Sequence, residues 1–247
     1  MIPDRLPIFL RAHTVKVQRQ PKAPSKKDSA MPPRWPERAL LFDTETRTSI
    51  DQTLMFGVYR ICNLIDGQYR CSEEGLVYDE RLSKQELNTI GTFVANSFPD
   101  IELPCFPPKI RLRVHRSFPE FMEHVFFPAL RKGWLIVGFN LPFDLSRLSL
   151  DWRTHNGGFA LIFSKTWWRK TQCWVANPYR PPIILEAKDA RTVFMSRGST
   201  KRPAEWPNEA RLLDIGTLLF SLFDQHCSLR DWWCRIYSSI MCPYVRG

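Results

Sequence analysis

The stretch that decides the fold is "ALLFDTETRTSIDQTLMFGVYRI", residues 39–61. Its first apolar run ends in two acids, Asp43 and Glu45, which are separated by Thr44. Because side chains alternate along a strand, we expect both acids on one face and Thr44 on the other. Two close carboxylates at the end of a buried strand are costly unless a cation lies between them. The stretch alone leaves two interpretations open, a metal site or a frayed strand end with solvated acids.

A second stretch, "IVGFNLPFDLSRL" (136–148), favours the metal site. It places Asn140 at the end of a hydrophobic strand (134–140) and Asp144 in the first turn of the following helix. Helix N-termini stabilise carboxylates, and α/β sheets keep their sites at the carboxyl ends of strands. An acid at a helix start is common by itself, so the combination with Asp43 and Glu45 carries the prediction. Three such oxygen ligands suit Mg²⁺ or Mn²⁺.

The remaining pattern predicts an α/β fold with a mixed sheet flanked by helices. Three strands (39–43, 53–61 and 67–79) linked by short loops indicate an antiparallel meander, and the "DG" dipeptide at 66–67 indicates its hairpin turn. Capping boxes and apolar periodicity predict three helices, over 83–98, 117–133 and 142–152. Residues 156–200 are predicted to form a β-rich insertion, and 210–223 a strand that runs into an apolar helix.

Composition and charge define the class of protein. The chain has 247 residues, 44% of them hydrophobic, with a formal net charge of +10. Residues 1–38 hold nine Lys and Arg against three acids and are Pro-rich, so we expect a basic, disordered tail. No apolar run is long enough for a membrane helix, and no secretory signal is recognisable; we therefore expect a cytoplasmic protein with no membrane partner. The basicity favours nucleic acid as partner.

These motifs resemble a known family. "FDTET" is similar to the first motif, Asp-x-Glu, of the DEDD (DnaQ/RNase D-like) superfamily of 3′–5′ exonucleases, which has the ribonuclease H-like fold, and "VGFNLPFD" resembles its second motif. "LLDIGTLLFSL" (212–222) and "HCSLRDW" (226–232) resemble the segments that follow the second motif. The resemblance covers residues 39–232, in the family's order.

The resemblance implies a function and roles for single residues. Asp43, Glu45 and Asp144 would bind two Mg²⁺ or Mn²⁺ ions, typically about 4 Å apart, that hydrolyse a phosphodiester. The substrate would be a single-stranded 3′ end of DNA or RNA. Thr44, Asn140 and Phe143 would contact it, with Phe143 either stacking on a base or packing its helix. Asp214 matches a position that is not a metal ligand in the family, and we interpret it as a strand-end cap.

The sequence departs from the family at the third motif. The family has a fourth carboxylate there, in Tyr-x-x-x-Asp or His-x-x-x-x-Asp, whereas four residues after Tyr237 stands Met241. His226 and Asp231 have the second spacing, but they align better with the preceding segment. We expect 233–247 to be an atypical, truncated or frameshifted end, and the exonuclease to be impaired.

A non-catalytic nucleic-acid-binding module on the same fold is the alternative to the exonuclease. It draws support from the basic tail and from "WWRK" (167–170), whose aromatic rings are able to stack on bases. For Trp167 and Trp168, however, we expect burial in the core, as is usual for adjacent tryptophans. Seven cysteines without a CxxC pair argue against a structural zinc site built from cysteine.

Overall fold

The computed structural model describes residues 35–96, 112–187, 193–206 and 211–223. The chain divides into two compact units, one of residues 36–215 and one that joins 1–35 to 216–247. The second unit contributes most of one helix, α5 (Ile215–Phe223), to the described residues. Most of the predicted basic tail and all of 224–247 lie outside the described residues.

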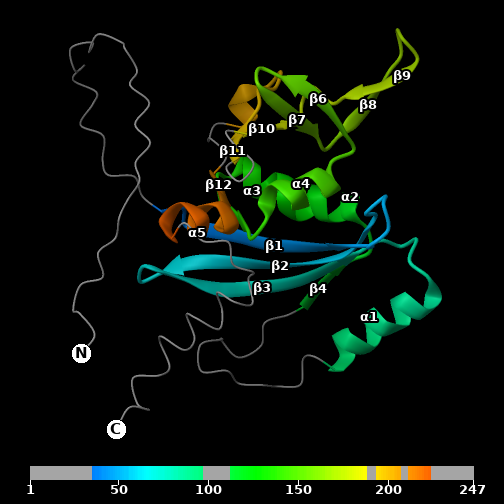
Figure 1. Ribbon diagram of the computed structural model, residues 1–247, viewed down its shortest axis with the longest axis vertical. Coiled ribbons are helices and arrows are strands. Elements are labelled where there is room, and N and C mark those ends of the chain that lie inside the picture. The colour runs from blue at the N-terminus through cyan, green and yellow to red at the C-terminus, as the bar shows by residue number, and fades with distance from the viewer. Residues whose placement is uncertain (1–34, 97–111, 188–192, 207–210, 224–247) are drawn as a thin grey trace. The chain divides into compact units, whose positions relative to one another are not determined.

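A six-stranded mixed sheet is the centre of the first unit (Figure 1). Strand β2 pairs antiparallel with β1 and β3, whereas the β1–β5, β5–β12 and β3–β4 pairs are parallel. The strands lie in the order β12 (Arg211–Asp214), β5 (Leu135–Gly138), β1 (Arg38–Thr46), β2 (Leu54–Ile65), β3 (Gln68–Tyr78) and β4 (Leu112–His115). The predicted meander joined to parallel strands is confirmed, and the arrangement is consistent with a ribonuclease H-like core.

The turn between β2 and β3 forms at the Asp66–Gly67 dipeptide, as predicted. Asp66 and Gly67 both have positive φ, 51° and 76°, the left-handed backbone that a tight two-residue hairpin needs. Strand β4, in contrast, was not predicted from the sequence. It is only four residues long at the edge of the sheet, and its alternating Arg113 and His115 do not read as a hydrophobic strand.

Helices α2 (Phe118–Phe121), η1 (Met122–Phe126) and α3 (Phe127–Arg131) cover one face of the sheet. We predicted one continuous helix over 117–133, but its middle is a π-helical turn. Pro128 has no N–H to donate to the carbonyl four residues earlier, which explains why the preceding turn is wider. Helix α1 (Lys84–Asn96) begins at the predicted capping box, since Ser83 and Glu86 exchange hydrogen bonds between side chain and backbone.

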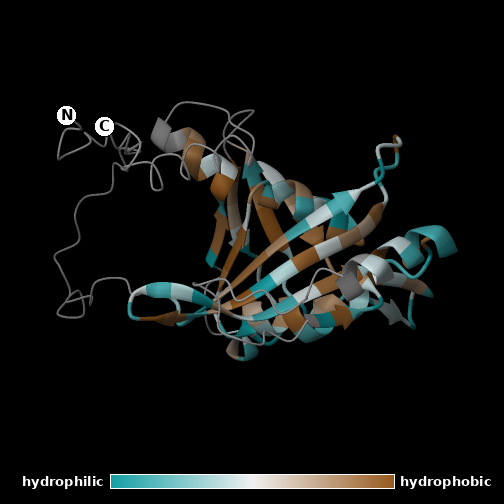
Figure 2. Ribbon diagram, turned by 90° about the horizontal axis from the view of Figure 1, so that it is seen from below, coloured by the Kyte–Doolittle hydropathy of each residue, from teal (hydrophilic) through white to brown (hydrophobic). Residues whose placement is uncertain are grey.

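Helix α4 (Leu141–Leu148) ends four residues before the predicted end at residue 152. Strand β6 starts at Asp151, so Trp152 belongs to the insertion rather than to the helix. The helix packs Leu141 and Leu145, both fully buried, into the main core. Figure 2 shows hydrophobic residues concentrated along the central strands.

The main core lies between the sheet and these helices. It is rich in aromatic side chains, and its fully buried members include Leu40, Ile136, Phe121, Phe126, Leu130, Leu141, Leu145, Ile183 and Trp206. Because these residues come from β1, β5, the α2–α3 segment, α4 and the insertion, one continuous core joins all of them. None of the helices in the described ranges is long and apolar enough to cross a membrane.

The predicted β-rich insertion is confirmed as two antiparallel sheets. The larger has four strands, β6 (Asp151–His155), β7 (Gly158–Ile162), β10 (Ile183–Ala187) and β11 (Val193–Arg197). The smaller is a hairpin of β8 (Lys165–Trp168) and β9 (Cys173–Ala176), which extends away from the other strands of the insertion in Figure 1. A short 3-10 helix, η2 (Pro203–Glu205), follows.

A substitution at Gly75 on β3 tests the packing of the meander. A Cβ atom at this position would lie 2.0 Å from the ring of Tyr59 on β2. We expect Gly75→Ala to lower the free energy of unfolding by about 1–3 kcal/mol, the usual cost of overpacking. Gly91→Ala in α1, where nothing lies within 4 Å, is the control and should stabilise by about 0.5–1 kcal/mol. Urea unfolding midpoints measure both; an unchanged midpoint for Gly75→Ala would contradict this packing.

Candidate active site

Asp144 joins helix α4 to the exposed end of strand β1. Pairing between β1 and β5 stops at Leu41, so the following residues of β1 have no strand partner on that side. The Asp144 carboxylate takes the place of that partner. Its Oδ1 accepts hydrogen bonds from the backbone N–H of Thr44, at 3.2 Å, and from the Thr44 hydroxyl, at 2.6 Å. The predicted second acid therefore lies directly over the predicted first motif.

The Asp144 carboxylate is buried and only half satisfied. The residue is 2% exposed, and its Oδ2 has no hydrogen-bond partner among the described residues. Desolvation, together with the smaller effects of the charges of Asp43 and Asp214, raises the pKa of Asp144 to about 6, against the hydrogen bonds from Thr44. At neutral pH the carboxylate is thus ionised at considerable cost, and a bound cation would remove that cost.

Asp43 and Glu45 alternate with Thr44 as predicted. Both acids are exposed, whereas Thr44 is buried. Desolvation raises the pKa of Asp43, whose charge also reaches Asp144. Glu45 lies two residues further along β1, next to the bulge between Glu45 and Thr46. Within the described ranges, the ligand atoms of these three acids do not all lie within 4.8 Å of one another. The three acids therefore do not form a close cluster of ligand atoms, although Asp43 and Asp144 interact electrostatically.

Asp214 positions the helix that carries Asp144. It is buried at the end of β12 and accepts a hydrogen bond from the Leu141 N–H at 2.8 Å. Asp214 thus lies at a strand end, and the group that it caps is the N-terminus of α4. Asn140 is the N-cap residue: its carbonyl accepts from the N–H groups of Phe143 (2.9 Å) and Asp144 (3.2 Å), and its side chain is exposed without a capping bond.

The predicted substrate contacts surround this helix start. Phe143 is half-buried and lies outside the main core cluster, and the Arg147 guanidinium lies 5.1 Å from its ring centroid. Because the Phe143 ring is partly exposed beside a cation, it is accessible for stacking on a base. The substrate contacts of Phe143, Thr44 and Asn140 stay predictions. His226 and Asp231, the weaker version of the third motif, lie outside the described residues.

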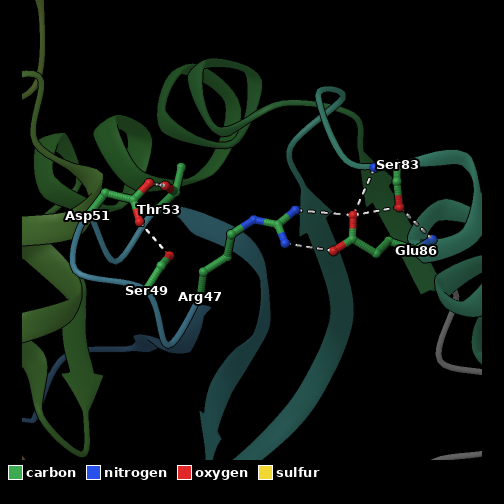
Figure 3. Close-up of polar contacts among 6 residues, drawn as sticks. All are labelled: Arg47, Ser49, Asp51, Thr53, Ser83 and Glu86. Carbon is green, nitrogen blue, oxygen red and sulfur yellow. Dashed lines mark hydrogen bonds and ion pairs between the residues drawn. The ribbon is translucent and has the colours of Figure 1, made fainter.

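The loop after β1 is fastened to the start of α1 (Figure 3). Arg47 forms an ion pair with Glu86, at 3.0 Å, while Glu86 also caps its own helix through Ser83. The hydrogen bond from Arg47 lowers the pKa of Glu86 to about 2. Within the same loop, the Asp51 carboxylate accepts hydrogen bonds from the hydroxyls of Ser49 and Thr53. These contacts hold the backbone next to Glu45 in place.

The tryptophans of the β8–β9 hairpin correct one expectation. Trp167 and Trp168 are 48% and 40% exposed, not buried, and Trp174 is 63% exposed. A two-stranded sheet has no further layer to cover such rings. Trp167 and Trp174 instead pack edge to face across the strands, with ring centroids 5.7 Å apart. The basic turn residues that follow Trp168 are exposed as well.

A basic pocket of about 320 Å³ lies beside this hairpin. Three cations line it, Arg153, Arg180 and Lys201, and no described acid does. Lys201 also lies over the ring of Trp168, 5.9 Å from its centroid, which joins the pocket to the hairpin. The hydroxyl of Thr200, another lining residue, is buried without a described partner. Arg180 also forms an ion pair with Glu123, so Arg153, Lys201 and the Thr200 hydroxyl are the groups of the pocket that suit an anion.

One group of residues that could bind a metal ion was not predicted from the sequence. His115, Glu120 and His124 offer ligand atoms that all lie within 4.8 Å of one another, the one such group among the residues that the structure describes. Their spacing matches no common metal motif, and the strand that carries His115 was not predicted. Burial lowers the pKa of His115, so its ring is neutral at pH 7.

No protein-family model matches the chain, and no curated protein matches it.

The pKa of Asp144 predicts a pH-dependent stability. Because folding raises this pKa from its ordinary value near 4 to about 6, the stability that it contributes is present below pH 4 and is lost as pH rises through 6. Two pKa units correspond to about 3 kcal/mol. In chelator-treated buffer, Asp144→Asn should therefore gain about that much relative to the wild type between pH 4 and pH 7. Urea unfolding at both pH values measures the gain; identical pH profiles would contradict the burial of this charge.

Proposed function

We propose that this protein is a metal-dependent nuclease of the 3′–5′ exonuclease type, with Asp43, Glu45 and Asp144 as ligands of Mg²⁺ or Mn²⁺. The observation that carries the proposal is the buried Oδ2 of Asp144, which has no hydrogen-bond partner among the described residues, on a carboxylate that interacts electrostatically with Asp43. A bound pair of divalent ions would supply an activated water and stabilise charge on the attacking and leaving oxygens. The substrate is the single-stranded 3′ end of DNA or RNA.

The chain's own residues hold this site in place. Thr44 donates two hydrogen bonds to one oxygen of Asp144 and leaves the other oxygen, Oδ2, without a hydrogen-bond partner among the described residues. Asp214 fixes the start of α4, and Asn140 and Phe143 line the same helix start, where they would contact the terminal nucleotide. Because the third motif of the family is not recognisable, we propose slow turnover.

Shortening of labelled oligonucleotides tests the activity. The wild type should shorten 5′-labelled single-stranded DNA or RNA slowly from the 3′ end, only when Mg²⁺ or Mn²⁺ is present. Asp43→Ala and Asp144→Asn should abolish the reaction, because each removes a ligand. Thr44→Val, which removes an outer-shell hydrogen bond, should cost about 10- to 100-fold.

Asp151→Asn is the matched control, since Asp151 is an exposed acid in the insertion that pairs with Lys165. It should leave the rate unchanged. Cleavage that survives Asp144→Asn, or no cleavage with either metal ion, would contradict the proposed function. Fast, processive cleavage would instead contradict the proposed slow turnover.

A second candidate, non-catalytic binding of single-stranded nucleic acid, is favoured by the exposed tryptophans and the basic pocket. Aromatic rings that stack on bases, next to cations that contact phosphates, are the usual parts of such a surface. Lys201 lines the pocket and lies over the ring of Trp168 in the hairpin, so the pocket and the hairpin adjoin. This function and the nuclease are compatible, since the hairpin would hold the strand that the acids cleave.

Fluorescence anisotropy in chelator-treated buffer tests this binding alone. Trp167→Ala and Trp174→Ala should each weaken binding to a labelled single strand by about 1–3 kcal/mol, the typical contribution of one stacked base. Trp152→Ala on β6 is the control, because Trp152 is also exposed but packs on Phe159 outside the hairpin. Equal losses in all three variants, or none in the hairpin variants, would contradict this surface.

A further inference from the structure

The second cluster of ligand-type residues lies at the edge of the central sheet, away from β1. His115 ends strand β4, Glu120 lies in α2, and His124 lies in the π-helical turn η1. His115 is buried, Glu120 is half-buried and His124 is exposed, so the group reaches from the interior to the surface. We call it the His–Glu–His cluster.

Hydrogen bonds decide which nitrogen of His115 carries the proton. The Tyr59 hydroxyl donates its single proton to Glu73 Oε1 at 3.0 Å. It can therefore only accept from His115 Nε2, which lies 3.0 Å away. In the neutral ring, Nδ1 is then an unprotonated lone pair. This Nδ1 is buried and has no hydrogen-bond partner among the described residues.

The lone pair of His115 faces a carboxylate. Glu120 Oε1 lies 3.5 Å from Nδ1, and the other oxygen, Oε2, accepts a hydrogen bond from the Arg116 N–H at 2.9 Å. Two acceptors that face each other across 3.5 Å repel unless a cation lies between them. The separation is close to the roughly 3.4 Å edge of a tetrahedron with zinc–ligand bonds near 2.1 Å.

We propose that the His–Glu–His cluster is a zinc site, with His115 Nδ1, Glu120 Oε1 and a ring nitrogen of His124 as ligands. Two imidazoles and one carboxylate are a common ligand set for Zn²⁺, and imidazole favours it over Mg²⁺. The chain from His115 through Tyr59 to Glu73 is the outer-shell support that orients a ligating histidine. The fourth position faces solvent beside His124 and takes a water molecule.

Competition against a chromophoric chelator tests the site on the full chain. Chelator-treated wild type should take up one tightly bound Zn²⁺ and unfold at a higher temperature in its presence. His124→Gln and Glu120→Gln should each weaken zinc binding by more than the roughly 10- to 100-fold that loss of an outer-shell partner costs. His124 is exposed, so its variant keeps the fold, and the unfolding temperature without zinc verifies this.

Two controls separate this site from other ligands in the chain. His155→Gln on β6 and Asp43→Asn at the candidate active site should bind zinc like the wild type. Replacement of zinc by Co²⁺ should give visible bands without thiolate-to-cobalt charge transfer, which excludes the cysteines. Full zinc affinity in His124→Gln, a thiolate band, or no zinc uptake by the wild type would overturn the proposal.

Discussion

The hydrogen bonds from Thr44 to Asp144 are the contact on which the candidate active site depends. They join the free edge of β1, beyond the last residue that pairs with β5, to the first turn of α4. Without them, the backbone N–H of Thr44 would be buried and unsatisfied, and Asp144 would be a buried charge without any partner. The same contact leaves the other carboxylate oxygen of Asp144 without a hydrogen-bond partner among the described residues.

Other elements of the fold hold the two partners of this contact in position. Asp214 on β12 holds the N-terminus of α4, and the buried Leu141 and Leu145 fix its inner face in the core. The loop that follows β1 is tied to α1 by the ion pair of Arg47 and Glu86. Three strands and two helices thus position acids that come from only two short motifs.

The parts of the fold with strong local signals were predictable from sequence. The meander, its Asp66–Gly67 turn and the capping box at Ser83 each follow from residues close in the chain. The alternation of Asp43, Thr44 and Glu45 followed from strand geometry alone. The contact of Thr44 with Asp144 did not, because 100 residues separate them.

Other features depend on tertiary structure that a single sequence does not encode locally. Trp167 and Trp168 looked like core residues, and only the isolation of the β8–β9 hairpin leaves them exposed. The end of α4 at Leu148 is set by the pairing of β6 with β7, not by a helix-breaking residue. The partners of His115 come from β2, α2 and η1, so their convergence is visible only in the fold.

The central claim is that the carboxylates at the end of β1 hold a divalent metal ion. The most direct test is a crystal structure of the protein soaked in Mn²⁺, with the metal located by its anomalous scattering. The account predicts manganese bound between Asp43 and Asp144, with Asp144 Oδ2 among its ligands. Crystals with free solvent access to this sheet end, saturated with Mn²⁺ and without an anomalous peak there, would contradict it.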